Sequence, residues 1–282
     1  MRPERVLVCA GLAAALLPSA CSRELPAERA SNIAHETRAM SAPPGAASDA
    51  VPARAAPGAG HGIAVVELFT SEGCSSCPPA DRELARLAAR AKADSLPIFP
   101  LSFHVDYWNY LGWRDRFSDA GYSERQRGYG GLSAGGGTYT PQAVINGQAE
   151  TVGSNASRID GLVATALERD SRNQVTLEAK RGARAIEVSY RIEGERGARV
   201  LNLALVEPRA ESRVERGENA GEHLAHVNVV RAFESRPLSA GSSGSASLSV
   251  PPELATRPVG VVAYVQALAQ GDVSGAAALE LQ

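Results

Sequence analysis

One stretch, from Ile63 to Arg90, constrains the fold most strongly because it joins an apolar run to a closely spaced pair of cysteines. The run Ile63-Ala64-Val65-Val66-Glu67-Leu68-Phe69 has the length and character of a buried strand. After a short turn come Gly73-Cys74-Ser75-Ser76-Cys77-Pro78-Pro79 and then an apolar helical pattern. Prolines are tolerated in the first turn of a helix, where a missing amide hydrogen costs little. We therefore predict a strand, a Cys-x-x-Cys turn and a helix in that order.

Two thiols at the start of a helix are suited to redox chemistry. The amides and the positive end of the helix dipole stabilise a thiolate there, which lowers the pKa of Cys74 and makes it the nucleophile. Cys77 would then resolve the mixed disulfide. Two alternatives stay open, a structural pair without chemistry and a soft-metal site such as one for copper(I). A closed zinc site is not expected, because zinc normally takes four ligands and there is no second Cys-x-x-Cys.

The N-terminus predicts export. Arg2 and Arg5 precede an apolar run that ends at Leu17, so residues 1–20 are typical of an export signal and too short to span a membrane. The small residues before Cys21 resemble a bacterial lipoprotein cleavage site, although Pro18 stands where a leucine is usual. Cys21 is therefore a candidate lipidation site, with a soluble exported protein as the alternative. Either outcome predicts a periplasmic location, and the first adds a lipid anchor in the membrane.

Export would leave only two cysteines as free thiols in the mature protein. Of the four cysteines, Cys9 leaves with the signal and Cys21 would be acylated, so redox chemistry falls to Cys74 and Cys77. The net charge of -2 gives no reason to expect a nucleic acid partner. We expect the partners to be thiols or disulfides of envelope proteins, with no cofactor. Residues 21–62, rich in Ala, Pro, Gly and Ser, read as a disordered tether.

A first folded domain is predicted over residues 63–172. The apolar run from Pro97 to Val105 predicts a second buried strand, parallel to the first and joined to it by the helix. An insertion rich in Tyr and Trp spans residues 106–137, with a helical part near 118–127. Asn146-Gly147 then predicts a β-hairpin, and a further helix is expected to start near Ser154 or Asn155.

This order of elements, with Thr140-Pro141 before the hairpin, resembles the thioredoxin superfamily over about residues 63–170. The resemblance implies a mixed sheet flanked by helices and a cis bond before Pro141. It also implies that the backbone of Thr140 lies beside the dithiol and pairs with a substrate. In the same alignment Leu68 replaces a buried aspartate that helps to deprotonate the resolving cysteine, and Glu67 points to the opposite face.

Three segments narrow the resemblance to one family. They are Glu67-Leu68-Phe69-Thr70-Ser71-Glu72-Gly73-Cys74, His104-Val105-Asp106-Tyr107-Trp108 and Tyr139-Thr140-Pro141-Gln142. These segments are similar to those of the bacterial exported family filed as domain of unknown function 1223. The resemblance implies no particular substrate.

Three histidines and their acidic neighbours are further candidates. His104 and Asp106 alternate onto one strand face, where they could transfer protons or line the site rim, bind a metal with the cysteines, or anchor the insertion. His223 and His226 could bind a metal together if their segment were helical, because residues three apart share a side of a helix but face opposite sides of a strand. We expect the segment to be a surface loop leading into a strand instead. Glu218 or Asn219 of that segment could contact the first domain.

From Asn173 onward the apolar residues alternate, and the pattern predicts six or more short antiparallel strands. The predicted fold is thus an α/β thioredoxin-like domain followed, over residues 173–282, by an antiparallel β-sandwich-like domain. The predicted function is thiol-disulfide oxidoreduction on envelope proteins, with Cys74, Cys77, Thr140 and Pro141 as site residues. The alternatives are a copper(I) chaperone and a non-catalytic interaction protein.

Overall fold

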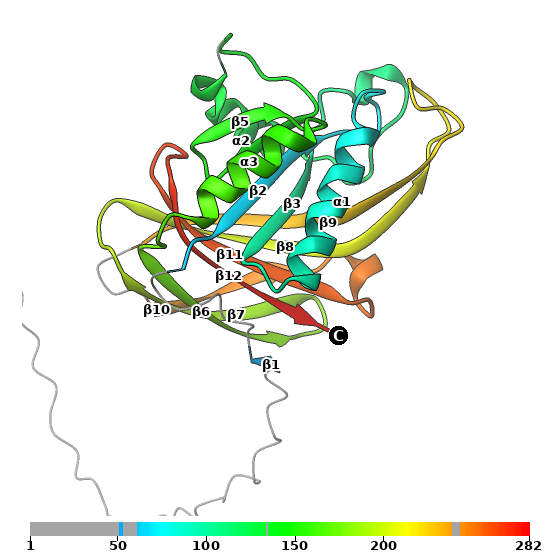
Figure 1. Ribbon diagram of the computed structural model, residues 1–282. Helices are drawn as coiled ribbons and strands as arrows, with labels where there is room; N and C mark the ends of the chain where they lie inside the picture. Colours follow the sequence, from blue (N-terminus) through cyan, green and yellow to red (C-terminus); the bar gives the residue numbers. More distant parts are fainter. Residues whose placement is uncertain (1–50, 53–60, 134, 239–242) are drawn as a thin grey trace, which may run out of the picture. The chain divides into compact units, whose positions relative to one another are not determined.

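The computed structural model describes residues 51–52, 61–133, 135–238 and 243–282 (Figure 1). The predicted export signal, Cys21 and most of the predicted tether lie outside these residues. Within the tether, β1 (Val51–Pro52) pairs antiparallel with β6 (Asn173–Arg181). Among the described helices, none combines the length and the apolar character that crossing a bilayer requires.

Eight strands form one mixed sheet in the order β12-β11-β8-β9-β3-β2-β4-β5. Their bounds are β2 Ala64–Thr70, β3 Ile98–His104, β4 Gln142–Ile145, β5 Ala149–Val152, β8 Arg199–Arg213, β9 His223–Pro237, β11 Val259–Ala267 and β12 Val273–Leu281. β2 and β3 are parallel, which confirms the prediction, and β3 is also parallel to β9 through Ser102 and Val229. A second, smaller sheet has the order β1-β6-β7-β10, with β7 at Ala185–Gly194 and β10 at Ser243–Ser249.

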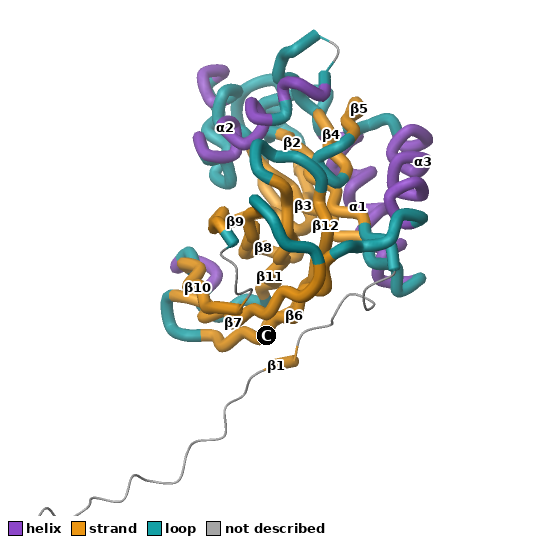
Figure 2. Tube along the Cα trace, turned by 90° about the vertical axis from the view of Figure 1, so that its left-hand side faces the viewer, coloured by secondary structure: helices purple, strands orange, loops and turns teal. Residues whose placement is uncertain are grey.

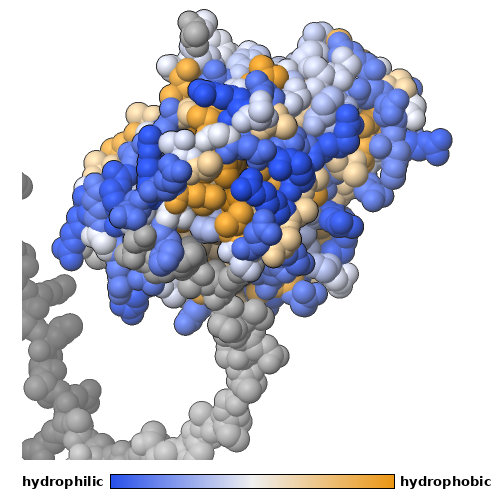
Figure 3. Space-filling model, viewed as in Figure 1, coloured by the Kyte–Doolittle hydropathy of each residue, from blue (hydrophilic) through white to orange (hydrophobic). Residues whose placement is uncertain are grey.

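The α-helices lie on both faces of β2 and β3. Helices α1 (Pro78–Ala93) and α3 (Ala156–Leu167) cover one face, and α2 (Ala120–Gly128) lies on the other (Figure 2). Short 3-10 turns occupy Asn109–Leu111, Gly130–Leu132 and Pro252–Leu254. The α1 and α3 side chains pack with Val66 and Leu68 in one apolar cluster. Figure 3 shows apolar residues of this face reaching the surface between hydrophilic ones.

Side chains on the two faces of β8 pack into two further apolar cores. Leu201, Leu203 and Leu205 pack with the small sheet, whereas Ala204 and Val206 pack in the cluster that contains Phe69 and Phe103. Successive side chains of a strand point to opposite faces, so one strand can serve two cores. β8 thereby joins the β-rich part of the chain to the part that carries the cysteines.

The predicted fold class is wrong. The molecule is mostly β, and it is not a helix-flanked thioredoxin-like domain followed by a separate sandwich, because β9, β8, β11 and β12 extend the sheet that contains β2 and β3. The burial pattern of β3 predicts a central strand, but it carries no information about which distant strand covers its outer edge. β12 also lies beyond the last strand that the alternation indicates. The division at residues 172 and 173 stays a prediction.

The predicted hairpin and helix starts are confirmed, because the residues of a turn or a helix cap determine these features locally. Asn146 and Gly147 connect β4 to β5 with φ of 49° and 65°, the left-handed values that this hairpin turn requires. The side chain of Asn155 accepts a hydrogen bond from the Arg158 amide and caps α3. The helix of the insertion, α2, also lies near its expected position.

Candidate functional site: a buried dithiol and the carboxylates beside it

The two cysteines lie where the sequence predicts, between β2 and α1. Cys77 is the N-cap residue of α1, and Pro78 and Pro79 form the first turn. Both cysteines are free thiols and both are buried, with Cys74 1% exposed and Cys77 0% exposed. The hydroxyl-bearing residues between them, Ser75 and Ser76, are exposed. The two exposed serines of the turn therefore lie between the buried thiols and the solvent.

The pKa of Cys74 is lowered to about 6. A hydrogen bond from Cys77 is the largest cause, and bonds from Ser76 and Thr140 add to it against the opposing effect of burial. The Thr140 hydroxyl donates to Cys74 Sγ over 3.2 Å, and the Ser76 hydroxyl lies at the same distance. Cys74 is therefore largely a thiolate at neutral pH, the form that attacks disulfides.

Cys77 has the opposite character. Burial, together with the neighbouring Cys74 and Asp81, holds the pKa of Cys77 far above its ordinary value, and the Thr70 hydroxyl only partly offsets this. The pair thus consists of a nucleophilic thiolate and a protonated thiol that donates a hydrogen bond to it. This asymmetry is what an attacking and a resolving cysteine require.

Thr140 and Pro141 are both beside the dithiol. The bond between them is cis, as the resemblance implied. Trp108 Nε1 donates to Thr140 Oγ1 over 2.8 Å, so the aromatic insertion orients the hydroxyl that reaches Cys74. The carbonyl oxygen of Thr140 is 3.9 Å from Cys74 Sγ.

His104 and Asp106 do not act as a pair. His104 is fully buried at the end of β3, and its Nδ1 lies 2.7 Å from Asp115 Oδ2. Asp106 instead accepts a hydrogen bond from Ser123 of α2. Burial alone would raise the pKa of Asp115, but His104 and the amides of Glu72 and Phe117 hold it below its ordinary value. Both residues therefore anchor the insertion, which is one of the alternatives that the sequence left open.

The loop between β8 and β9 caps the cysteine turn. Glu218 Oε2 accepts a hydrogen bond from the Ser75 amide over 2.9 Å. Asn219 Nδ2 donates to the carbonyl oxygens of Glu72 and Cys74 over 2.8 and 3.0 Å. These contacts confirm that the segment around Glu218 and Asn219 reaches the first half of the chain.

The expectation of a surface location is right for His223 and wrong for His226. Both lie on β9, three residues apart, and therefore point to opposite sides of the strand. The side chain of His223 is 64% exposed, whereas that of His226 is 0% exposed. His226 points into the protein towards Glu72 and Asp81, a few residues before β9 pairs with β3 at Val229.

Sequence reasoning missed two site residues, Glu72 and Asp81, and expected a third, His226, at the surface. His226 Nδ1 is 3.6 Å from Asp81 Oδ2, and its Nε2 is 3.5 Å from Glu72 Oε1. Burial alone would lower the pKa of His226, but the two carboxylates raise it to about 10. A signal for Asp81 was present, because a residue four positions after Cys77 on a helix lies on the same face. No local signal links His226 to the cysteines.

Among the described residues, no group of side chains adds metal ligands to the two cysteines. Within residues 61–133, 135–238 and 243–282 there is no group of three or more His, Cys, Asp or Glu side chains arranged to hold a metal ion. The copper(I) alternative would therefore depend on the two cysteines themselves, and it stays a prediction.

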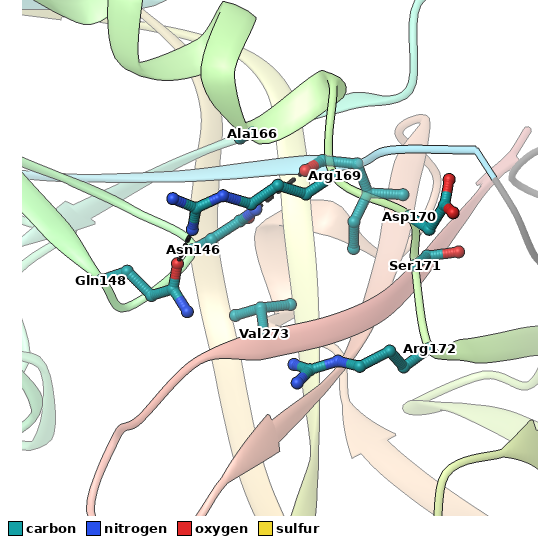
Figure 4. Close-up of a pocket in the computed structure, with 9 residues that line it drawn as sticks. Asn146, Gln148, Ala166, Arg169, Asp170, Ser171, Arg172 and Val273 are labelled. Atoms are coloured by element: carbon teal, nitrogen blue, oxygen red, sulfur yellow. Dashed lines mark hydrogen bonds between the residues drawn. The ribbon is translucent and has the colours of Figure 1, made fainter.

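A pocket of about 290 Å³ lies at the other end of β2 from the dithiol, beside Ile63 (Figure 4). Both of its arginines have partners, one within the pocket and the other outside its lining. Arg169 donates to Gln148, and Arg172 forms ion pairs with Asp272 and Glu195. Because none of the dithiol residues lines this pocket, it is separate from the candidate site.

Comparison with known proteins places the site within a family. A family model described as a protein of unknown function, DUF1223, matches residues 65–266. A crystal structure of a protein from Agrobacterium tumefaciens, solved as a structural genomics target, is similar with 29% identity and a TM-score of 0.57. That similarity covers 77% of this chain and 94% of the other. No curated protein matches the chain significantly.

Proposed function

We propose that this chain, which belongs to the DUF1223 family of proteins of unknown function, is a thiol-disulfide oxidoreductase that acts through Cys74 and Cys77. The observation that carries the proposal is the asymmetry of the two thiols. The pKa of Cys74 is lowered to about 6, whereas that of Cys77 is held far above its ordinary value. Perturbed pKa values gather at functional sites.

The reaction proceeds in two exchanges. The Cys74 thiolate attacks one sulfur of a substrate disulfide, which forms a mixed disulfide and releases the first substrate thiolate. Cys77 then loses its proton and attacks Cys74 Sγ, which forms the Cys74–Cys77 disulfide and releases the second substrate thiolate. The substrate gains two electrons and, with two protons, becomes two thiols, while the dithiol is oxidised. The same steps in reverse would oxidise a substrate dithiol.

Thr140 supports this chemistry in two ways. Its hydroxyl donates to Cys74 over 3.2 Å and stabilises the thiolate. Its backbone lies beside the attacking sulfur and is suited to pairing with the extended chain of a substrate. We infer kinship with the thioredoxin superfamily at the level of this site, on the basis of the Cys-x-x-Cys turn at a helix start and the neighbouring Thr140-Pro141.

The proposed substrates are disulfides or dithiols of envelope proteins. This part of the proposal depends on the N-terminal sequence, which predicts export and, with Cys21, a lipid anchor. Cys74 is 1% exposed and the serines beside it are exposed. We therefore expect the substrate sulfur to approach over the turn as the Ser76 hydroxyl moves aside.

Cysteine variants test the function. We expect reduced Cys77→Ser to form a stable mixed disulfide with a peptide disulfide, because Cys74 still attacks but nothing resolves the product. Intact-mass measurement should show the peptide adduct, and a reductant should remove it. Cys74→Ser should form no adduct and should neither reduce nor oxidise the peptide. Full activity in Cys74→Ser, or no adduct on Cys77→Ser, would contradict the proposal.

A further inference from the structure

The resolving step presents a problem that the dithiol alone does not solve. Cys77 must lose a proton before it attacks, yet burial and its negatively charged neighbours hold its pKa far above the ordinary value. The position at which the thioredoxin-like pattern places a buried carboxylate is occupied by Leu68, which packs in an apolar cluster. Another group must take the proton if the proposed function is correct, and the inference below rests on that function.

We propose that Asp81 accepts the proton of Cys77 through the hydroxyl of Thr70, and that His226 positions Asp81 for this role. Asp81 is 4% exposed and lies one helical turn after Cys77 on α1. Thr70, the last residue of β2, donates from Oγ1 to Asp81 Oδ1 over 2.9 Å, and the same hydroxyl lowers the pKa of Cys77, which places it next to that thiol. A hydroxyl can accept one hydrogen bond while it donates another, so it can pass a proton from sulfur to carboxylate.

His226 reaches this arrangement from a distant part of the sequence. β9 runs beside α1 (Figure 1), and His226 projects from it between the carboxylates of Asp81 and Glu72. Asp81 thus has one oxygen toward Thr70 and the other toward His226. Trp113 Nε1 donates to the second oxygen of Glu72 over 2.7 Å and fixes that carboxylate.

Buried charges of both signs lie around Asp81. His226 has a pKa of about 10 and carries a positive charge at neutral pH. When both carboxylates are ionised, Asp81, Glu72 and His226 together carry one net negative charge in a buried place. His226 thus offsets one of the two negative charges that the carboxylates would otherwise place in this buried region. His104 also faces His226, with ring centroids 4.7 Å apart, and its Nδ1 is hydrogen-bonded to Asp115.

The hydrogen bonding of these side chains is incomplete. Four of their buried polar atoms have no hydrogen-bond partner: Glu72 Oε1, His104 Nε2, His226 Nδ1 and His226 Nε2. Buried polar atoms are nearly always paired. These atoms leave hydrogen-bonding capacity beside Asp81. The β-rich half of the chain would thus complete the dithiol site.

Atoms and electrons balance along this route. The Cys77 proton passes to Thr70 Oγ1 as the Thr70 proton passes to Asp81 Oδ1. The Cys77 thiolate then forms the bond to Cys74 Sγ, and the bond between Cys74 and the substrate sulfur breaks. The substrate thiolate leaves and takes a proton from water, and Asp81 returns its proton to solvent.

The release of two thionitrobenzoate chromophores distinguishes attack by Cys74 from attack by Cys77. The full-length chain with Cys9 and Cys21 replaced by Ser is reduced and mixed with one equivalent of dithiobis(nitrobenzoate). The first thionitrobenzoate reports attack by Cys74, and the second reports attack by Cys77. In Asp81→Asn the first release should stay within about twofold of wild type. The second should slow roughly 100-fold at pH 7, a size typical of a lost general base. Its rate should then rise about tenfold per pH unit, because hydroxide must remove the proton.

Matched variants distinguish proton transfer from loss of structure. Thr70→Val should behave as Asp81→Asn does, whereas Thr70→Ser keeps the hydroxyl and should keep the second release. His226→Asn should slow the second release by about tenfold, because Asp81 is no longer held. Glu83→Gln changes another buried carboxylate of α1, one paired with Arg86, and should leave both releases unchanged.

One outcome would contradict the role of Asp81, and a different outcome would contradict the proposed function. If the second release in Asp81→Asn and in Thr70→Val keeps the wild-type rate and pH profile, Asp81 is not the acceptor and this inference is overturned. If wild-type protein shows no first release faster than an unfolded cysteine peptide does, the proposed function itself fails. Thr70→Val provides the same test if Asp81→Asn does not fold.

Discussion

Two buried polar clusters on opposite faces of β2 differ in how completely their atoms are paired. The arginine cluster consists of Glu67, Arg125, Tyr129, Tyr264 and Gln266. The dithiol cluster consists of Cys77, Thr70, Glu72, Asp81 and His226. In the arginine cluster Arg125 forms two hydrogen bonds to Glu67, over 2.6 and 2.7 Å, and the tyrosine hydroxyls bind the same carboxylate. None of its side-chain polar atoms is unpaired, whereas Glu72 and His226 have three unpaired atoms between them.

This difference indicates that the arginine cluster has a structural role and the dithiol cluster a chemical one. Fully paired buried polar groups specify one arrangement of the surrounding elements and leave no site for a further proton. The arginine cluster joins β2 to α2 and β11 in this way. The dithiol cluster instead holds a charged histidine at 3.5 and 3.6 Å from its carboxylates, which leaves donors and acceptors available. Substitutions in the first cluster should therefore change stability most, and those in the second should change pH dependence.

The largest expected effect is on the free energy of unfolding. Glu67→Gln removes the partner charge of Arg125, which is buried and cannot be rehydrated. Leaving one charge of a buried pair unpaired costs about 3–5 kcal/mol. Denaturant unfolding monitored by circular dichroism measures it. Glu124→Gln, which alters an exposed ion pair with Arg127, should cost less than about 1 kcal/mol. Equal effects of the two substitutions would show that the arginine cluster does not stabilise the fold.

The second effect is the pH dependence of stability that His226 causes. Its pKa is about 10 in the folded state and about 6.5 when unfolded, so folding takes up a proton between these values. The stabilisation is complete below about pH 6.5 and is lost as pH rises through about 10. In His226→Gln the loss relative to wild type should be on the order of a few kcal/mol at pH 6 and should shrink towards pH 10.

The same measurement on His223→Gln provides the control. His223 is on the same strand, but its side chain is 64% exposed beside Glu211. Its removal should leave the stability curve parallel to that of wild type. A stability difference for His226→Gln that is independent of pH would show that His226 is not charged in the folded protein.

The smallest expected effect concerns the pKa of Cys74. The rate of its alkylation in Cys77→Ser follows the thiolate fraction, which should fall as the pH falls through the pKa of Cys74. Thr140→Val removes a hydrogen bond to the thiolate, and bonds to charged groups contribute roughly 1.5–3 kcal/mol. We therefore expect the midpoint to rise by about one pKa unit, since one unit corresponds to about 1.4 kcal/mol.

Thr138→Val is the matched control for that substitution, because Thr138 is exposed two residues earlier on the same segment. It should leave the alkylation midpoint unchanged. If Thr140→Val and Thr138→Val share one midpoint, the Thr140 hydroxyl does not stabilise the thiolate.

Most of the local structure could be predicted from the sequence, whereas the sheet could not. The Cys-x-x-Cys turn, the β2–β3 pair, the Asn146-Gly147 hairpin and the cap of α3 are all determined by residues within a few positions of each other. The sheet order depends on pairs such as Ser102 with Val229, which are distant in sequence. Alternation predicts that a strand has a buried face but does not identify its neighbour.

The candidate site divides in the same way. The sequence by itself determined the two thiols, their place at the start of a helix and the Thr140-Pro141 segment beside them, because spacing and turn chemistry act locally. It also determined that Glu67 and Leu68 face opposite sides of β2. Only the tertiary structure decided that His226 and Asn219, from the β-rich half, lie against Cys74, Glu72 and Asp81. The physical reason is that packing, and not distance along the chain, sets which buried groups of opposite charge meet.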